Sequence, residues 1–362
     1  MISVSLYTGV FYNILLLIVI CISIQTVLYR NRPLMDGFHN YLSVCVLFLA
    51  IIIYIGFRPI EYGYLGDTFT YSEYYSGYER GEEIPEKADW LFHYLMKFSS
   101  GYVGVHCFFL LVAIIYVGCL LKASERLFSN NVFLGFLACI TAFSFLGYGI
   151  NGIRNGAASS VMLLAMTYYP SRVKLIIGGI ISVGLHGSML LPLLVCILAM
   201  FCHRSGIYYL MWLGCLLFSL LTGKYLMDFF MGVSFVDSRL SGYINNVSDL
   251  DLFSHTGFRW DFLLYSIPPL LVGYYVVVKK KVDDKLYSFF LNVYLLTNAF
   301  WLLVIQIPYS NRFAYLSWFM YPVLLIYPFL RIQLWHQQYA KVAMCLFCQF
   351  GFTYFMWVIG KL

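Results

Sequence analysis

The sequence has few charged residues for its length and lacks the common signatures of soluble enzymes. Charged residues make up 11% of its 362 residues, 61% are hydrophobic, and the mean hydropathy is +0.79. Soluble globular proteins carry about 25% charged residues. The sequence contains no GxxxxGK phosphate motif, no HExxH and no GxSxG. These absences argue against ATP-driven transport and against zinc or serine hydrolysis, and the composition is that of a membrane protein.

The distribution of cysteine and the absence of repeats exclude further classes. Every one of the ten cysteines lies in or at the end of an apolar stretch, and none lies in the longest polar segments. These segments therefore have no disulfide framework, and no metal-ligand cluster is visible in the sequence. No period of about 20 to 50 residues repeats, which argues against a solenoid.

Long apolar runs dominate the chain. A helix needs roughly 20 apolar residues to cross the hydrocarbon core of a bilayer, and about 12 segments approach this length. We therefore predict an all-α polytopic membrane protein with about 12 transmembrane helices, in a single integral membrane domain over residues 1–362. The predicted spans are 4–28, 40–57, 103–121, 132–149, 154–169, 173–185, 188–202, 206–223, 262–278, 286–306, 313–330 and 342–360.

The segments 173–185 and 188–202 could form either two helices or a single long one. Lysine and arginine accumulate on the cytoplasmic side of a membrane, so their distribution separates the two cases. With two helices, 13 basic residues lie on the side that carries KKKVDDK and 10 on the other, whereas a single helix gives 11 and 12. The asymmetry favours two helices, with both termini outside and His186 in the outer turn between them. The excess of basic residues on the cytoplasmic side accounts for the net charge of +6, and nothing in the sequence indicates a nucleic-acid partner.

Two long loops, 58–102 and 224–261, lie outside in this topology. The first is acidic and rich in tyrosine, and its last part places Trp90, Tyr94 and Phe98 at helical spacing. This pattern predicts an amphipathic helix at the membrane interface. An acidic, aromatic outer surface suits a sugar, because aromatic rings stack on pyranose faces and carboxylates accept hydrogen bonds from hydroxyl groups. Aromatic belts at membrane interfaces give the same composition without any ligand.

Several ionisable residues lie at the outer ends of the predicted spans. Arg154 begins one span in GIRNGAASSVMLLA, where the positive end of the helix dipole disfavours a guanidinium unless an anion is near. A diphosphate would supply this anion. The N–H groups at a helix N-terminus donate hydrogen bonds to phosphate, and an arginine guanidinium forms bidentate hydrogen bonds with two phosphate oxygens. Ionisable groups near hydrocarbon are costly and usually face a cavity or each other. Besides Arg154, the ionisable residues at the outer ends of the predicted spans are Arg58, Asp67, His186, Arg259 and Arg312.

Each of these residues also has a purely structural interpretation. An arginine can extend to lipid headgroups, His186 can form a hydrogen bond across packed helices, and Asp67 can close an Asx-type turn in LGDT. Four outer arginines are harder to explain in this way, because the positive-inside rule depletes the outer side of such residues.

The ordered set of motifs carries a resemblance over nearly the whole chain. The segments GDTFTYSEYY, ADWLFHYLMK, GIRNGAASSVMLLA, GLHGSMLLPLL and NRFAYL follow one another in the sequence. Together they resemble the bacterial O-antigen and exopolysaccharide polymerases of the Wzy type, especially the branch of EpsG-like proteins. Asn155 stands where this pattern has a glutamine after the arginine.

The resemblance implies a membrane glycosyltransferase with a GT-C-like helical fold. It implies an inverting, metal-independent reaction without a cofactor, in which repeat units linked to undecaprenyl diphosphate serve as donor and acceptor. The protein would be a multi-pass protein of the bacterial inner (cytoplasmic) membrane, with its active site facing the periplasm. Its expected partners are these lipid-linked oligosaccharides, membrane lipid and a separate chain-length regulator.

The candidate roles follow from the needs of such a reaction. Arginines stabilise the departing diphosphate, and one base takes the proton of the acceptor hydroxyl. Arg154, Asp67 and His186 are the predicted catalytic residues. Asp67 and His186 compete for the role of base, because histidine titrates near neutrality while Asp67 has better access to sugar hydroxyls. The predicted substrate-binding residues are Arg312 for diphosphate and Arg58, Arg239, Arg259, Asp89 and Tyr71 for further phosphate or sugar contacts.

Rival functions are also compatible with the residues. A lipid-linked oligosaccharide flippase or another transporter predicts internal pseudosymmetry and charged groups near the bilayer midplane, whereas the charged groups here cluster at one face. A membrane acyltransferase that modifies the glycan would require His186 but not the outer arginines. A ligase that moves finished glycan to another lipid is scarcely separable from a polymerase by sequence.

Overall fold

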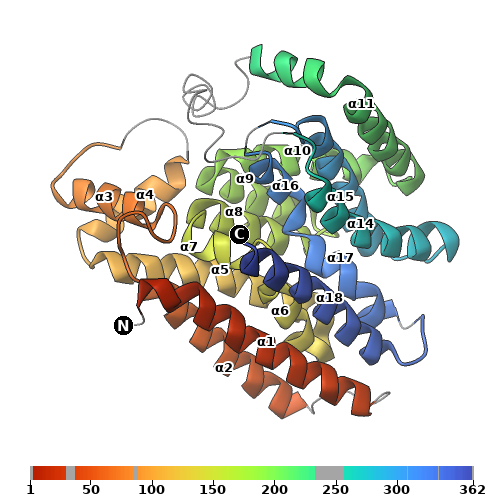
Figure 1. Ribbon diagram of the computed structural model, residues 1–362, viewed down its shortest axis with the longest axis horizontal. Coiled ribbons are helices and arrows are strands. Elements are labelled where there is room, and N and C mark those ends of the chain that lie inside the picture. Colours follow the sequence, from red (N-terminus) through yellow and green to blue (C-terminus); the bar gives the residue numbers. More distant parts are fainter. Residues whose placement is uncertain are drawn as a thin grey trace. The chain divides into compact units, whose positions relative to one another are not determined.

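The structure is a computed structural model that describes residues 3–29, 37–84, 89–232, 257–307, 309–332 and 334–360 (Figure 1). All secondary structure in this part of the chain is helical. Eight of its segments are long and apolar enough to cross a membrane, which supports the predicted multi-pass helical class, whereas the predicted number of about 12 spans is not confirmed. The eight segments are Val4–Leu28, His39–Gly56, Val105–Ile140, Ser205–Gly223, Trp260–Lys279, Lys285–Leu303, Asn311–Ile332 and Gln338–Val358.

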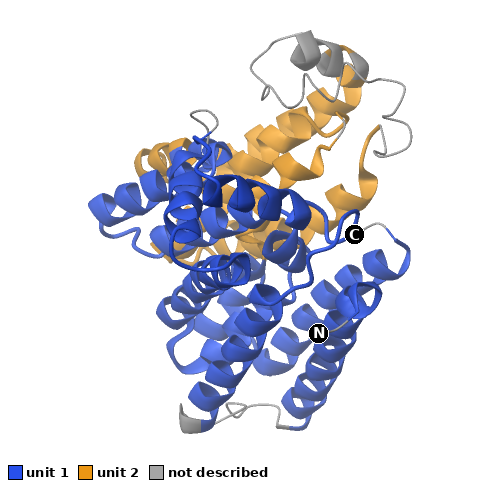
Figure 2. Ribbon diagram, turned by 90° about the vertical axis from the view of Figure 1, so that its left-hand side faces the viewer, with its two compact units in different colours: residues 1–193, 322–362 blue, residues 194–321 orange. Residues whose placement is uncertain are grey.

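The chain forms two compact units, which Figure 2 distinguishes by colour. Unit 1 comprises residues 1–193 and 322–362, and unit 2 comprises residues 194–321. The single integral membrane domain stays a prediction.

The framework of unit 1 is built from its longest helices. Helix α1 (Val4–Tyr29) packs against α18 (Gln338–Val358), although the two lie at opposite ends of the sequence (Figure 1). Helix α5 (Val105–Phe128) packs against α2 (Gly37–Gly56) and against the helices that carry the candidate site. Exposed leucines and isoleucines on α1 and α2 suit helices that face lipid.

The segment after α5 is more broken than the sequence predicted. Instead of one span at 132–149, the structure has two short helices, α6 (Val132–Ile140) and α7 (Phe145–Ile150). Helix α8 (Ile153–Met166) begins and ends within a few residues of the predicted segment 154–169. At the break after α6, Gln349 of α18 donates a hydrogen bond to the carbonyl of Ala138 across 2.7 Å. Such side-chain bonds satisfy carbonyl groups that a broken helix would otherwise leave unpaired in an apolar interior.

The turn from α7 to α8 depends on a close backbone approach. A Cβ atom on Gly156 would lie 2.5 Å from the carbonyl oxygen of Tyr148, so only glycine fits where α8 passes α7. The turn lets α8 begin inside unit 1, and the side chain of Arg154 on its first turn is only 14% exposed.

The segment 173–202 forms two helices, as the charge distribution predicted. Helix α9 (Arg172–Leu185) and α10 (Leu190–Phe201) are separated by a 3₁₀ turn, η2 (Gly187–Met189). His186 lies between α9 and this turn, with an extended backbone. Helix α9 packs against α8 and thereby brings His186 towards the start of α8.

The predicted first loop contains two helices that pack against each other. Helix α3 (Thr68–Glu79) lies beside α4 (Trp90–Ser100), and α4 also contacts α5 and α9 (Figure 1). The predicted amphipathic helix is thus confirmed as a helix. Its buried face includes Phe92 and Met96, whereas the aromatic residues at helical spacing, Trp90, Tyr94 and Phe98, are 49%, 60% and 69% exposed. Their position at a membrane interface stays a prediction.

Unit 2 is built on α11 (Ser205–Gly232), which packs against α15 (Lys285–Leu303). Helix α14 (Trp260–Gly273) continues as a π-helical turn, η3 (Tyr274–Lys279), and packs against α16 (Asn311–Trp318) and α15. Most of the second predicted loop, including Arg239, lies outside the described residues.

A buried hydrogen-bond network joins four helices of unit 2. The amide of Asn298 on α15 donates to the hydroxyls of Ser266 and Ser317, at 3.3 and 3.0 Å, and its carbonyl oxygen accepts from the indole of Trp212 at 2.8 Å. Polar side chains of this kind hold helices together where neither helix gains from burying apolar surface.

Candidate active site

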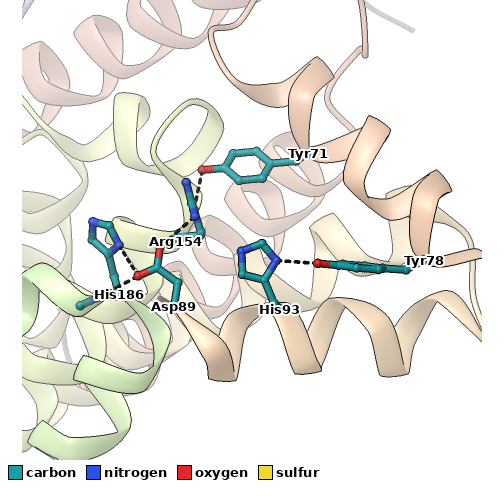
Figure 3. Close-up of polar contacts among 7 residues, drawn as sticks. Tyr71, Tyr78, Asp89, His93, Arg154 and His186 are labelled. Atoms are coloured by element: carbon teal, nitrogen blue, oxygen red, sulfur yellow. Dashed lines mark hydrogen bonds and ion pairs between the residues drawn. The ribbon is translucent and has the colours of Figure 1, made fainter. Parts of the chain in front are cut away.

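Three charged or titratable side chains of unit 1 meet at the start of α8 (Figure 3). Nη1 of Arg154 lies 2.8 Å from Oδ2 of Asp89. The other carboxylate oxygen, Oδ1, lies 3.0 Å from Nδ1 of His186. The side chains of Asp89, Arg154 and His186 are 3%, 14% and 19% exposed. The structure thus brings together three predicted site residues that lie far apart in the sequence.

Asp89 reaches this position from the N-terminus of α4. It is the N-cap residue of the helix, with φ 57° and ψ 33°, in the left-handed region that aspartate and asparagine tolerate better than most residues. Its side chain does not cap α4 itself. Instead, Oδ1 accepts a hydrogen bond from the backbone N–H of Gly187 across 2.9 Å. The carboxylate thus joins the first turn of α8, through Arg154, to the turn that follows α9.

Asp89 is the anion that Arg154 requires in this structure. Burial raises the pKa of the Asp89 carboxyl, but the hydrogen bond and charge of His186, the charge of Arg154 and the N–H of Gly187 outweigh it. The pKa of Asp89 is therefore held well below its usual range, and the carboxyl is ionised at neutral pH. Arg154 is paired inside the protein rather than extended to a lipid headgroup.

Tyr71 of α3 contacts Arg154 from the opposite side. Nε of Arg154 donates to the phenol oxygen of Tyr71 at 3.3 Å, and the guanidinium carbon lies 5.5 Å from the centre of the ring. Burial raises the pKa of Tyr71, so the phenol stays protonated at neutral pH. Figure 3 also shows Tyr78 of α3 bonded to His93 of α4, at 2.8 Å, beside this cluster.

The pairing with Asp89 fixes the orientation and tautomer of His186. A carboxylate only accepts hydrogen bonds, so Nδ1 of His186 carries the proton in this contact and Nε2 has a lone pair when the ring is neutral. Within the described residues, no hydrogen bond is made by Nε2. The structural interpretation of His186, a hydrogen bond across packed helices, therefore holds, and it leaves a free basic nitrogen on the ring.

Asp67 lies beside the cluster without a direct contact to Arg154. The residue is exposed, and its side chain does not cap α3, so the Asx-type alternative does not describe it. Its backbone N–H donates to Oδ1 of Asn151 at 2.9 Å, which attaches the start of α3 to the loop before α8. The negative charge of Asp67 acts on both Tyr71 and Arg154.

Arg58 lies inside unit 1 rather than at its surface. The residue is 1% exposed, donates to Oγ1 of Thr68 at 3.0 Å and to the carbonyl of Ile55 at 3.0 Å, and stacks over Phe109. Its Nη2 atom is buried without a hydrogen-bond partner. Burial lowers the pKa of Arg58 to about 10, so the guanidinium stays charged at neutral pH. In this structure Arg58 therefore supports α3 from within, and its predicted contact with substrate stays untested.

The remaining predicted arginines belong to unit 2. Arg259 precedes α14, forms an ion pair of 2.7 Å with Asp261 and stacks over Phe262. Arg312 is on the first turn of α16, with its guanidinium 5.2 Å from the ring centre of Tyr309. Both charges act on the hydroxyl of Tyr315, so the two arginines belong to one cationic region.

Among the described residues, no group of three or more His, Cys, Asp or Glu side chains is placed to hold a metal ion.

Comparison with known proteins identifies the family. The model of the EpsG family matches residues 41–361. The chain belongs to the EpsG family. No curated protein and no solved structure gives a significant match. Membership of the EpsG family indicates a polymerase-like function in exopolysaccharide or O-antigen biosynthesis, with a glycosyltransferase-like activity. The matched range includes Asp89, Arg154 and His186 as well as Arg259 and Arg312.

Sequence reasoning missed the supporting contacts of this EpsG-family site. It placed Asp89 among the sugar-binding residues and did not pair the carboxylate with Arg154, 65 positions further along. The one local signal was an aspartate directly before an amphipathic helix, which is a typical N-cap position. No local signal indicated that Thr68 and Asn151 would join α3 to the loop before α8.

Proposed function

We propose that this EpsG-family chain is a polysaccharide polymerase of the bacterial inner membrane. It joins oligosaccharide repeat units carried by undecaprenyl diphosphate, at the periplasmic face, by inversion at the anomeric carbon and without a metal ion. Family membership and the multi-pass helical structure support the class of protein. The observation that carries the reaction is the meeting of Arg154, Asp89 and His186 in one largely buried cluster.

Arg154 is proposed to bind the diphosphate of the donor. As the anomeric carbon–oxygen bond breaks, its electron pair passes to the diphosphate, and negative charge grows on the departing oxygens. A fixed guanidinium stabilises this charge without the reorganisation that water would need. Before the donor arrives, Asp89 and Tyr71 hold Arg154 at the start of α8.

His186 is proposed to be the base that activates the acceptor. Nε2 takes the proton of the acceptor hydroxyl while the hydroxyl oxygen forms the new bond to the anomeric carbon. An inverting displacement needs a single base on the face opposite the leaving group. The geometry favours His186 over Asp67, because the hydrogen bond from Nδ1 to Asp89 orients the ring and stabilises its protonated form. Asp67 is then assigned to the sugar hydroxyls, to which its exposed carboxylate has access.

The cationic region of unit 2 is assigned to substrate as well. Arg312 is proposed to contact diphosphate, and Arg259 and Arg239 to contact phosphate or sugar. The exposed aromatic residues of α4 are proposed to lie at the membrane interface, where rings are favourable. A separate protein is proposed to regulate chain length.

The test compares surface polysaccharide on gels from a strain that lacks the corresponding gene. The strain is complemented with wild type, Arg154→Ala, His186→Ala or Glu82→Gln, an exposed acid on the first loop that serves as control. The membrane level of each protein is measured by immunoblot. We expect the deletion strain to make lipid with a single repeat unit, wild type and Glu82→Gln to restore the ladder, and Arg154→Ala and His186→Ala to lose it.

Three other results would overturn the proposal in favour of its rivals. Full ladders that lack only a substituent in the deletion strain indicate an acyltransferase. Accumulation of repeat units on the cytoplasmic face indicates a flippase. Loss of glycan transfer to the final lipid, with polymer still formed on undecaprenyl diphosphate, indicates a ligase.

A further inference from the structure

The guanidinium that the proposed function assigns to substrate is already occupied by a carboxylate of the protein. Nη1 of Arg154 and Oδ2 of Asp89 are 2.8 Å apart, with both side chains largely buried. We propose that Asp89 is a positioning residue that holds Arg154 in the resting enzyme, releases it to the donor diphosphate, and keeps its contacts with His186 and Gly187. This inference rests on the proposed function, because it takes Arg154 as the diphosphate ligand and His186 as the base.

The two oxygens of Asp89 have separate partners, which makes such an exchange geometrically simple. Oδ2 contacts Arg154, whereas Oδ1 contacts Nδ1 of His186 and the N–H of Gly187. The guanidinium can therefore leave without loss of the bonds that hold the carboxylate. Asp89 stays in place as a ligand of His186 after Arg154 has turned to the substrate.

Arg154 has donors to spare for a larger anion. A guanidinium has five N–H groups in a planar fork, of which Nη1 uses a bond to Asp89 and Nε a longer bond to Tyr71. Within the described part of the chain, Nη2 makes no hydrogen bond. A diphosphate carries more negative charge than one carboxylate and offers oxygens on two phosphorus atoms, so it competes well for this fork.

The exchange couples binding of the donor to the strength of the base. In the resting enzyme, Arg154 neutralises part of the Asp89 charge that His186 experiences. When diphosphate takes Arg154, the charge of Asp89 is no longer offset by the guanidinium, and it favours the protonated imidazole more strongly. His186 therefore becomes a stronger base only when a donor is bound, which limits proton abstraction in its absence.

Binding measurements on the full-length protein in nanodiscs test this coupling, with undecaprenyl diphosphate as the probe. The variants are Asp89→Asn, Arg154→Gln and the double variant, with Glu82→Gln as a control for loss of an exposed acid from the same loop. Asparagine tolerates the left-handed backbone of position 89, so this change mainly removes charge. Turnover with lipid-linked repeat units is measured on the same samples.

We expect Asp89→Asn to bind undecaprenyl diphosphate about tenfold more tightly than wild type, since the protein anion no longer competes. At the same time its kcat falls about 100-fold, because His186 loses its charged partner. A structural role of Asp89 would lower both quantities together. In the Arg154→Gln background, Asp89→Asn changes the affinity less than about twofold, and Glu82→Gln behaves as wild type.

The failures of the two proposals are distinguishable. If Arg154→Gln weakens binding but Asp89→Asn leaves it unchanged or weaker, the exchange is overturned and the proposed role of Arg154 stands. If Arg154→Gln does not change the affinity, the proposed diphosphate site itself is overturned. Asp89→Gly, which adopts the left-handed backbone of this position and removes the charge, must give the same direction as Asp89→Asn. It also keeps the test available should the asparagine variant not fold.

Discussion

Nε of Arg58 donates a hydrogen bond to Oγ1 of Thr68 across 3.0 Å, with both residues fully buried. The same hydroxyl donates to the carbonyl of Ile150 at 2.7 Å. Thr68 thus connects the end of α2, the start of α3 and the end of α7. Because α3 carries Tyr71 and the loop after α7 leads to Arg154, this contact supports the candidate site from behind.

Thr68→Val is expected to lower the free energy of unfolding by about 1–3 kcal/mol, since it leaves a second buried donor of Arg58 and the carbonyl of Ile150 without partners. The matched control is Thr26→Val, at a buried threonine whose hydroxyl bonds only to Ile22 of its own helix. Unfolding in sodium dodecyl sulfate, followed by circular dichroism, measures both variants. Equal losses at the two positions would show that the contact with Arg58 adds nothing to stability.

Gly66 and Gly63 provide a matched pair in the turn before α3. Both have positive φ, +57° and +78°, so alanine at either position costs about 1–2 kcal/mol in backbone strain. A Cβ at Gly66 would also overlap the carboxamide of Asn151, whereas a Cβ at Gly63 meets nothing within 4 Å. Asn151 holds the backbone of Asp67, so its displacement disturbs the loop that leads to Arg154.

We therefore expect Gly66→Ala to reduce polymer formation at least tenfold and Gly63→Ala to reduce it little. Ladder intensity on gels, normalised to the amount of protein in the membrane, measures the difference. Similar losses in the two variants would mean that strain in the turn, rather than contact with Asn151, decides activity.

The helical class was predictable from composition, and several helices were predictable from the positions of the apolar runs. Helices α1, α2 and α15 begin and end within a few residues of the predicted spans, because an apolar run of this length is the direct requirement of a bilayer. The break between α6 and α7 was missed, because a broken helix is stabilised by partners that are distant in sequence. Gln349, which bonds to Ala138, is 211 positions away.

The candidate site was predicted as a set of residues but not as a set of contacts. The position of Arg154 at a helix N-terminus indicated that an anion was needed. Its identity depended on how α4 packs against α9, which periodicity does not encode. The burial of Arg58 was missed for a similar reason, since an arginine after an apolar run is equally compatible with the membrane surface. Residue type therefore indicated the chemistry, and tertiary packing determined the partners.

His186→Asn separates the two candidates for the base. The asparagine amide can reproduce the donor that His186 presents to Asp89 from Nδ1, but it has no basic nitrogen. We expect the unfolding free energy to change by less than about 1 kcal/mol and kcat to fall about 100- to 10,000-fold. His203→Asn, at an exposed histidine, is the control. If His186→Asn keeps most of its activity while Asp67→Asn loses it, Asp67 is the base.

The depressed pKa of Asp89 predicts how the cluster responds to acid. Asp89 has a lower pKa in the folded protein than in the unfolded chain, because His186, Arg154 and Gly187 stabilise its ionised form. The unfolded chain therefore binds more protons at this residue once the pH falls below the ordinary aspartate value of about 4. The stabilisation is complete above that pH and is lost as the pH falls further towards the folded-state pKa.

The unfolding free energies of wild type and Asp89→Asn should accordingly converge as the pH falls below about 4. Other carboxyl groups contribute equally to both proteins and cancel in the difference. The same comparison in a His186→Asn background removes the titration of the imidazole, so that only the pair of Asp89 with Arg154 and Gly187 is tested. A difference that stays constant down to pH about 2 would contradict the prediction. It would mean that Asp89 stabilises the fold through packing or hydrogen bonds that do not depend on its charge.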